Sequence, residues 1–177
     1  EPRRAPGMAA LPVDVRPGTC LVVGAGLSGA SVAASLARRG WQVQVLDAGA
    51  TPAAGASGLP AGVLAPHVSP DDSLLSRLSR AGVRATLQQA HTHLAQGVDW
   101  QPSGVLEHRV DGSPGIGAAA NASSQPASAT TLAAAGLPPD AVGCWHSPAG
   151  WIKPAQLVQA LLEQPGIHFV PHTTVAQ

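Results

Sequence analysis

Residues 19–47, TCLVVGAGLSGASVAASLARRGWQVQVLD, decide the fold that we expect for this chain. The short apolar run at 21–23 stops at a glycine and predicts a buried strand. Apolar residues at spacings of three and four then predict a helix, which Gly40 ends. The alternation of Val43 and Val45 predicts a second strand, and Asp47 follows it. This order of strand, turn, helix and strand indicates an α/β fold.

The turn after the first strand has the pattern G-x-G-x-x-G, formed by Gly24, Gly26 and Gly29. The first glycine allows a tight turn, the second lets a pyrophosphate approach the backbone, and the third lets the helix pack close to the strand. The free N–H groups and the positive end of the helix dipole then face the anion. Asp47 stands where a carboxylate accepts hydrogen bonds from a ribose, and it would repel a 2′-phosphate. The stretch therefore predicts dinucleotide binding.

A second loop of small residues, GASGLPAGVLAP at 55–66, follows the acidic strand end. Ser57 can donate to a phosphate, and Gly58 and Gly62 permit close approach of the backbone. Such a loop suits a cofactor that lies extended across the domain, although an ordinary Gly/Pro loop without a ligand has the same composition. The glycine pattern alone does not separate NAD from FAD.

Together with AGWIKPAQLVQALL at 149–162, these two loops resemble the D-amino-acid-oxidase-type family of FAD-dependent oxidoreductases. Within that family, three stretches are most similar to the FAD-dependent half of bifunctional tRNA-modifying enzymes. These stretches are RRGWQVQVLDAGATPAAGASGLPAG at 38–62, DDSLLSRLSRAGVRATL at 71–87 and DWQPSGVLEH at 99–108. The resemblance runs from about residue 19 to the end of the sequence.

The resemblance implies FAD as the cofactor and a Rossmann-like FAD-binding domain, interrupted by part of an inserted α+β substrate domain. It implies contacts to FAD from Gly24, Gly26, Gly29, Asp47, Ser57, Gly58, Gly62 and Val175. The backbone of Val175 would contact the adenine, and core packing is the alternative for this residue. No residue is predicted to be a catalytic acid or base.

The same resemblance divides the chain into four parts. Residues 1–18 are expected to be a linker, and 19–80 the first part of the FAD-binding domain. Residues 81–150 would belong to the substrate domain, and 151–177 would return to the FAD-binding domain with a helix at 154–163 and a strand at 167–170. Proteins of this family are about twice as long or more, so we expect a partial domain that does not turn over substrate alone.

The reaction implied by the resemblance is oxidation of a secondary amine. It would remove the carboxymethyl group from 5-carboxymethylaminomethyl-2-thiouridine at the wobble position of tRNA, in the cytoplasm, beside a fused or partner SAM-dependent methyltransferase. One alternative is an FAD-dependent oxidase or dehydrogenase of glycine, sarcosine or a D-amino acid. A second is a non-catalytic nucleotide-binding remnant. An NAD-dependent enzyme is a third, disfavoured by the GASG loop.

The composition of the chain limits which partners and which cellular settings the sequence itself supports. The chain has 177 residues, of which 45% are hydrophobic and 3% aromatic, and a net charge of zero. This balance gives no electrostatic footprint for nucleic acid, so a tRNA substrate rests on the resemblance alone. Cys20 and Cys144 lack a C-x-x-C spacing and are expected to be free thiols. No apolar run reaches the roughly 18 residues that span a membrane, and residues 1–18 lack the apolar region of a signal peptide.

Residues 71–96 predict a helix that Asp71 or Asp72 could cap. Arginines at 77, 80 and 84 recur at spacings of three and four, which indicates a solvated face or, alternatively, a contact with an anion or tRNA. His91 and His93 are two residues apart and point in different directions on a helix, so they make a poor metal pair, and no metal site is predicted.

The remaining patterns predict local structure. Residues 104–110 indicate a strand and 112–128 a mobile loop, because small residues dominate there. A short helix is expected at about 129–135. We expect His67 to lie on a surface loop, and Trp100, His146 and Trp151 to have structural roles.

Overall fold

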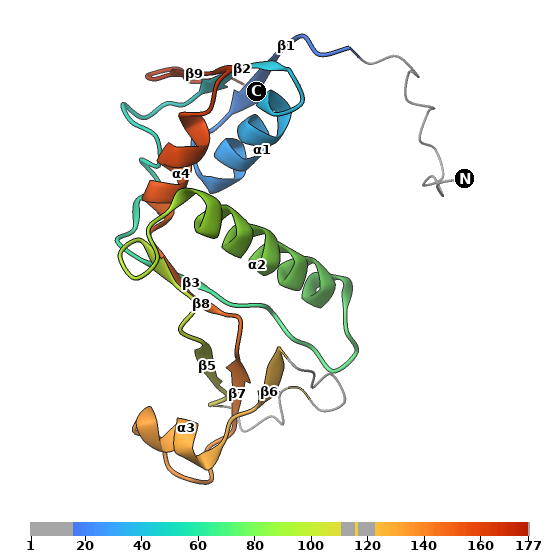
Figure 1. The fold of residues 1–177 in the computed structure, drawn as a ribbon, viewed down its shortest axis with the longest axis vertical. Coiled ribbons are helices and arrows are strands. Elements are labelled where there is room, and N and C mark those ends of the chain that lie inside the picture. Colours follow the sequence, from blue (N-terminus) through green and yellow to red (C-terminus); the bar gives the residue numbers. More distant parts are fainter. Residues whose placement is uncertain (1–15, 111–115, 117–122, 177) are drawn as a thin grey trace, which may run out of the picture.

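The computed structural model describes residues 16–110, 116 and 123–176 (Figure 1). At one end lies a three-stranded parallel sheet in the order β1–β2–β9, formed by Thr19–Val23, Gln42–Leu46 and Ile167–Val170. Helices α1 (Leu27–Ala37) and α4 (Pro154–Leu162) pack on one face of this sheet. Val43 and Val45 point to that face and are buried, while Gln42 and Gln44, which alternate with them, are exposed.

Small side chains let α1 approach the sheet closely. Ala30, Ala33 and Ala34 are fully buried on its inner face. The chain then turns at Gly40, whose φ of 87° suits glycine. On α4, four aliphatic side chains at spacings of one, three and four supply the other half of this core. They are Leu157, Val158, Leu161 and Leu162.

A second, antiparallel sheet connects the parallel sheet to the rest of the chain. Its order is β3–β8–β4, formed by Gly62–Leu64, Gly150–Ile152 and Trp100–Gln101. A Cβ atom at Gly150 would lie 2.0 Å from the carbonyl oxygen of Gln101, so only glycine fits there. Strand β8 leads directly into α4, and this links the two sheets.

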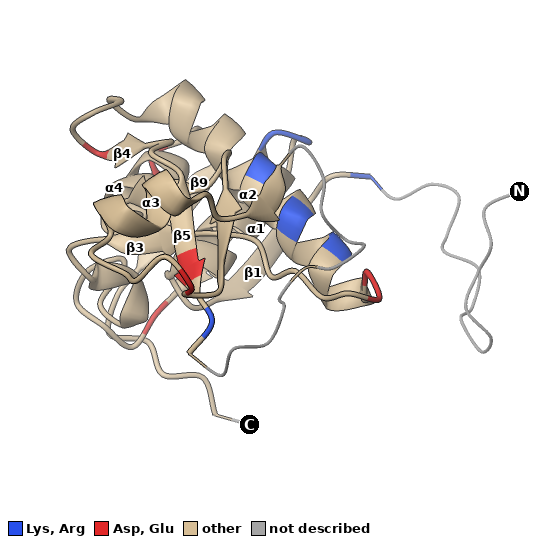
Figure 2. Ribbon diagram, turned by 90° about the horizontal axis from the view of Figure 1, so that it is seen from below, with Lys and Arg blue, Asp and Glu red and all other residues tan. Residues whose placement is uncertain are grey.

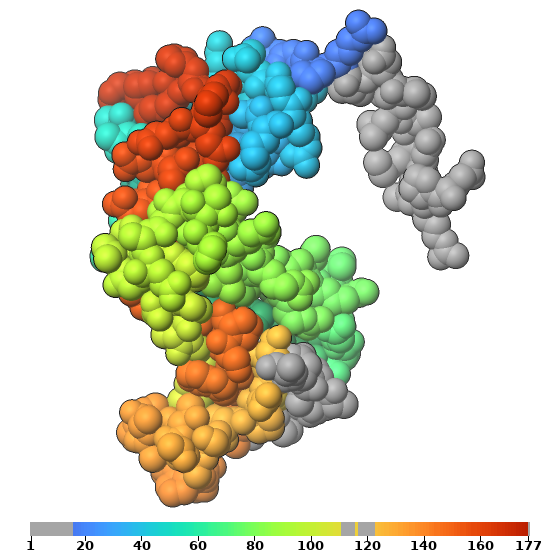
Figure 3. All heavy atoms as spheres, in the orientation of Figure 1, coloured from blue at the N-terminus to red at the C-terminus, as the bar shows by residue number. Residues whose placement is uncertain are grey.

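The far end of the molecule holds a third sheet, in the order β5–β7–β6. Its strands are Val105–His108, Gly143–His146 and Ser124–Pro126, and helix α3 (Ala129–Ala134) follows β6. Helix α2 (Leu74–His93) crosses the middle of the molecule, and Figure 3 shows its side chains next to those of α4. The main core reaches from α1 to Ala90 of α2 and to Trp100, which is 5% exposed.

These elements confirm the α/β Rossmann-like class and most of the expected elements. The strand–turn–helix–strand order at 19–47, the strand within 104–110, the short helix near 129–135, the helix near 154–163 and the strand at 167–170 are all present. Both cysteines are free, and Cys144 is buried. None of the described helices is long and apolar enough to cross a membrane.

Two local expectations need correction. Neither Asp71 nor Asp72 caps α2, because the side chain of Ser73 accepts the Ser76 N–H instead. Asp72 has a φ of 48° and forms an ion pair with Arg80. In addition, β6 lies inside the range 112–128 for which we expect a loop; residues 111–115 and 117–122 of that range lie outside the described residues.

Candidate functional site

The glycine turn between β1 and α1 supplies no capping side chain of its own to the N-terminus of the helix. The N-cap is Gly26, which has no side chain to accept the first helical N–H groups. A Cβ at Gly29 would lie 1.8 Å from the carbonyl oxygen of Gly24, so the turn closes this tightly only because residue 29 is glycine. Gly24 has a φ of 98°. The arrangement presents backbone N–H donors and a positive dipole end to an anion.

Asp47, at the end of β2, lies beside this turn. Its Oδ2 accepts the Ala25 N–H at 2.6 Å and its Oδ1 accepts the Gly49 N–H at 2.7 Å. These two hydrogen bonds, the one from Ala25 first, lower the pKa of the Asp47 carboxyl from its ordinary value. Each carboxylate oxygen can accept a further hydrogen bond. Asp47 therefore stays ionised. It can accept hydrogen bonds from ribose hydroxyls while its bonds to Ala25 and Gly49 stabilise the turn.

The second loop comes to the same place. Ser57 Oγ accepts the N–H of Leu27, the first residue of α1, at 3.0 Å. Its hydroxyl hydrogen can still donate to an anion at the helix end. A Cβ at Gly58 would lie 2.5 Å from the carbonyl oxygen of Ala53, so the short 3₁₀ turn Ala56–Gly58 requires glycine at its end. Residues 24–29, 47 and 57–58 thus converge on one end of α1.

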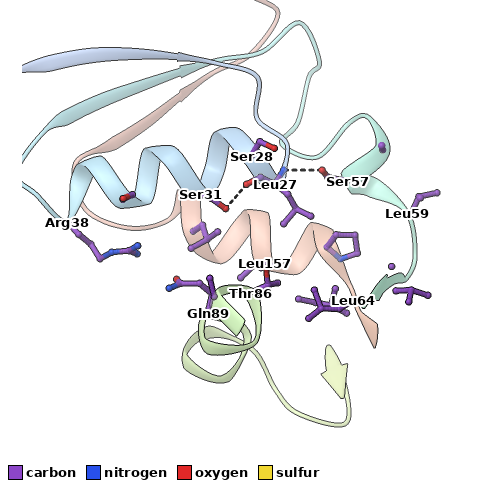
Figure 4. Close-up of a pocket in the computed structure, with 18 residues that line it drawn as sticks. Leu27, Ser28, Ser31, Arg38, Ser57, Leu59, Leu64, Thr86, Gln89 and Leu157 are labelled. Atoms are coloured by element: carbon purple, nitrogen blue, oxygen red, sulfur yellow. Dashed lines mark hydrogen bonds between the residues drawn. The ribbon is translucent and has the colours of Figure 1, made fainter. Parts of the chain in front are cut away.

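A cavity of about 720 Å³ begins at this point. Leu27 and Ser57 line the end near the glycine turn, and Gly62 of β3 lines the cavity as well. From there the cavity runs between α1, α2 and α4, and Figure 4 shows Ser28 and Ser31 of α1 on one side and Thr86 and Gln89 of α2 on the other. Leucine side chains from β3 and α4 give it a largely apolar lining. A flat ring system with a polar edge would suit such a lining.

The two remaining predicted residues lie at the borders of this site. Gly62 begins β3 and lines the cavity, and a Cβ there would make only ordinary van der Waals contacts with Ile152 and Pro154, at 3.9 and 4.0 Å. Val175 lies in the segment after β9. Two backbone hydrogen bonds join this segment to the loop that begins at Asp47: the His172 N–H donates to the Gly49 carbonyl oxygen, and the Thr173 N–H donates to that of Asp47. Its side chain is 47% exposed, so core packing, the alternative for Val175, is not what the structure shows.

Sequence reasoning missed the loop that holds the glycine turn in place. Ala53 is buried with a φ of 60°, and its N–H donates to the carbonyl oxygen of Ala25 at 3.0 Å. Gly49 donates to Asp47 two residues before it, which is an Asx turn. The pattern D-x-G at 47–49 could have indicated that turn. Nothing in the sequence marks Ala53, because alanine rarely adopts a positive φ.

The other candidates lie away from this site and have structural surroundings. His146 is fully buried; its Nε2 lies 3.1 Å from Glu107 and its Nδ1 lies 2.9 Å from Ser124 Oγ. Burial, with the nearby Glu107 charge, raises the pKa of the Cys144 thiol to about 11. His67 is exposed. In the described part of the chain, no three His, Cys, Asp or Glu side chains gather so as to hold a metal ion.

Substitution of Ser57 tests the link between the two loops. We expect Ser57→Ala to lower the free energy of unfolding by about 1 kcal/mol, because the Leu27 N–H loses its capping acceptor. Urea denaturation measures this difference. Ser103→Ala is the control, because Ser103 is exposed and its hydroxyl donates to the carbonyl oxygen of the next residue, Gly104. Equal stability of the Ser57→Ala variant and the unsubstituted chain would contradict the capping role.

The lowered pKa of Asp47 predicts a dependence of stability on pH. A carboxyl whose pKa is lower in the folded state stabilises the fold above its unfolded pKa of about 3.9, and this contribution is lost as the pH falls through the folded pKa. Denaturation curves from pH 7 to pH 3 should therefore show the chain losing stability toward acid more steeply than its Asp47→Asn variant. A stability difference between the two that stays constant across this range would contradict the prediction.

The fold and the site together define a dinucleotide-binding α/β protein. The parallel strand order, the glycine turn into α1 and the acid at the end of β2 form one mononucleotide-binding unit. The sequence comparison then specifies the class: the family described as "FAD dependent oxidoreductase" matches residues 19–177, and the chain belongs to this family. FAD is the cofactor of the family, as the resemblance implies.

Two curated relatives illustrate the similarity. A protein of Polaromonas sp. (strain JS666 / ATCC BAA-500) is 62% identical over 168 residues, which cover 90% of this chain and 26% of the relative. A protein of Paracidovorax citrulli (strain AAC00-1) is 59% identical, covering 100% of this chain and 29% of the relative. Both are named tRNA 5-methylaminomethyl-2-thiouridine biosynthesis bifunctional protein MnmC. The chain thus spans little more than a quarter of their length.

Solved structures share the fold at low sequence identity. L-α-glycerophosphate oxidase from Mycoplasma pneumoniae, solved with FAD bound, matches with a TM-score of 0.67 and 19% identity over 92% of this chain and 46% of that one. L-proline dehydrogenase from P. horikoshii matches with a TM-score of 0.69 and 16% identity, over 91% and 45%. These matches confirm the Rossmann-like fold.

Proposed function

We propose that this chain forms the FAD-binding part of an oxidoreductase that acts on a secondary amine in tRNA. The substrate would be 5-carboxymethylaminomethyl-2-thiouridine at the wobble position, from which the carboxymethyl group is removed. The observation that carries the proposal is the convergence of the α1 N-terminus, Asp47 and Ser57 on one dinucleotide site. It occurs in a chain 62% identical to a protein named for the biosynthesis of 5-methylaminomethyl-2-thiouridine in tRNA. Relatives of this name are bifunctional, which supports a methyltransferase partner and action in the cytoplasm, where tRNA is modified.

The residues of the site fit the ADP half of FAD. The backbone N–H groups that open α1, at Ser28 and Gly29, would face the pyrophosphate, and the Ser57 hydroxyl would donate to it. Asp47 would accept from the ribose hydroxyls, since both of its oxygens keep acceptor capacity. Val175 would present backbone groups to the adenine from the segment tied to Asp47.

Residues of this chain would also surround the flavin ring, where the reaction takes place. Bound FAD supplies two-electron oxidation of a carbon–nitrogen bond. The apolar lining around Gly62 and Leu64 would exclude water from the ring and hold it in place. No described residue at the site is assigned as an acid or a base. Residues 81–150 would form part of the substrate side, with the third sheet as its frame.

The first experiment is reconstitution. The purified chain is incubated with FAD and desalted, and bound flavin is read from absorbance bands at about 370 and 450 nm. The chain is then inserted in place of the matching 168 residues of the Polaromonas relative. Release of glyoxylate is measured with tRNA that carries the carboxymethylaminomethyl group. Oxidation of glycine, sarcosine and D-amino acids is measured in parallel by the loss of the flavin band at about 450 nm under anaerobic conditions.

Each outcome decides between the candidates. Glyoxylate release from tRNA, with no oxidation of free amino acids, is the expected result. Oxidation of free amino acids alone would assign the chain to an amino-acid oxidase. A flavin-loaded hybrid without any turnover would favour a non-catalytic nucleotide-binding unit. A hybrid that binds NAD and no flavin would overturn the proposal.

A further inference from the structure

Helix α2 carries a continuous row of side chains that donate hydrogen bonds. Arg77, Arg80, Arg84, Gln88 and His91 recur at spacings of three and four, which places them on one side of the helix. We call this row the basic face. Figure 2 shows its three arginines as blue segments along α2. The 20 residues of the helix contain no Asp or Glu, so its positive charge is not balanced within the helix.

Two of the three arginines are available to a ligand. Arg80 is paired with Asp72. Arg77 and Arg84 are exposed, and neither forms an ion pair with any other described residue. They lie seven residues apart, so about 10 Å of helix axis separates them. The chain as a whole is neutral, and the basic face is therefore a local concentration of charge.

The basic face is separate from the sides of α2 that pack or line the cavity. Val83 and Ala90 are buried toward the core, and Thr86 and Gln89 line the cavity. The exposed leucines of α2 lie only at positions 74, 75 and 78, near its N-terminal end. A helix that lies on a membrane needs an apolar side along its length, opposite its basic residues. Here the core and the cavity occupy that side, which disfavours a lipid surface as the partner.

A nucleic-acid backbone matches this chemistry. Guanidinium groups form forked hydrogen bonds with phosphate oxygens, and glutamine and histidine also donate to phosphates. We propose that the basic face of α2 binds the sugar–phosphate backbone of tRNA and positions the substrate on this part of the enzyme. The inference rests on the proposed function. That function requires a tRNA substrate, and the basic face would be the surface that binds it.

Salt-dependent binding tests the basic face. Fluorescence anisotropy measures the affinity of the chain for a labelled tRNA anticodon stem–loop between 50 and 300 mM KCl, chosen as roughly the range where counterion release is visible. Each of Arg77→Gln and Arg84→Gln should reduce the slope of log K against log salt by about 0.7–0.9, and the double variant by about twice that. Arg39→Gln is the matched control, because Arg39, just after the end of α1, is exposed but donates to Ser35 of that helix. It should leave the slope unchanged.

The outcomes separate this inference from the proposed function. Two results would overturn the basic face as the tRNA contact. One is an equal salt slope for the double variant and the unsubstituted chain, and the other is a failure of the chain to bind the stem–loop. If the hybrid enzyme still releases glyoxylate from tRNA in that case, the proposed function stands and only this inference fails. Binding of the chain to anionic phospholipid vesicles, lost in the double variant while RNA binding is kept, would assign the face to a membrane instead.

Discussion

The Gly29→Ala substitution is expected to abolish FAD retention and to lower the free energy of unfolding by about 1–3 kcal/mol. The added Cβ would lie 1.8 Å from the carbonyl oxygen and 2.9 Å from the carbonyl carbon of Gly24. Both are backbone atoms and cannot rotate away, so β1 and α1 must separate. That separation moves the helix N-terminus from the position in which it faces a pyrophosphate. Urea denaturation and flavin absorbance after desalting measure the two effects.

Two further glycines make this prediction specific. A Cβ at Gly82, on α2, meets no atom within 4 Å, so Gly82→Ala should be neutral or stabilising by up to about 1 kcal/mol. A Cβ at Gly26 meets only the Ser57 hydroxyl, at 3.1 Å. Gly26→Ala should therefore keep most of the stability and still weaken FAD retention. If Gly29→Ala were as stable as Gly82→Ala, the tight turn would not be the reason for glycine at position 29.

The second large effect is expected for Asp47→Asn. The carboxylate accepts two backbone N–H groups, at 2.6 and 2.7 Å, and the amide can accept only one of them. Hydrogen bonds to a charged acceptor contribute about 1.5–3 kcal/mol each, so stability at pH 7 should fall by about that amount. FAD retention should fall as well, because a ribose acceptor is lost and the loop at 47–54 loosens.

A matched substitution separates this local effect from a change of net charge. Asp140 is exposed in the turn that follows α3, and Asp140→Asn changes the charge by the same amount. It should alter the free energy of unfolding by less than about 0.5 kcal/mol and leave FAD retention unchanged. Equal losses of stability in the two variants would show that the Asp47 hydrogen bonds are not the cause.

Periodicity predicted the elements where one side of a helix or strand is buried. The buried alanines of α1 and the alternating valines of β2 follow spacings that can be read from the sequence, and the structure confirms both. Capping was predicted less well. Three polar residues in a row, Asp71, Asp72 and Ser73, can each cap a helix, and only the backbone geometry selects Ser73.

The sequence by itself determined the α/β unit at 19–47 and its glycine turn, because these depend on residues close together in the chain. It also determined the family with its cofactor, because each stretch that carries the resemblance can be read without its partners in the fold. The tertiary structure alone decided how Ser57 reaches Leu27, how Ala53 holds the turn, and that His146 is buried between Glu107 and Ser124. Each of these contacts joins segments more than 20 residues apart. Such contacts depend on packing between elements, which local sequence patterns do not encode.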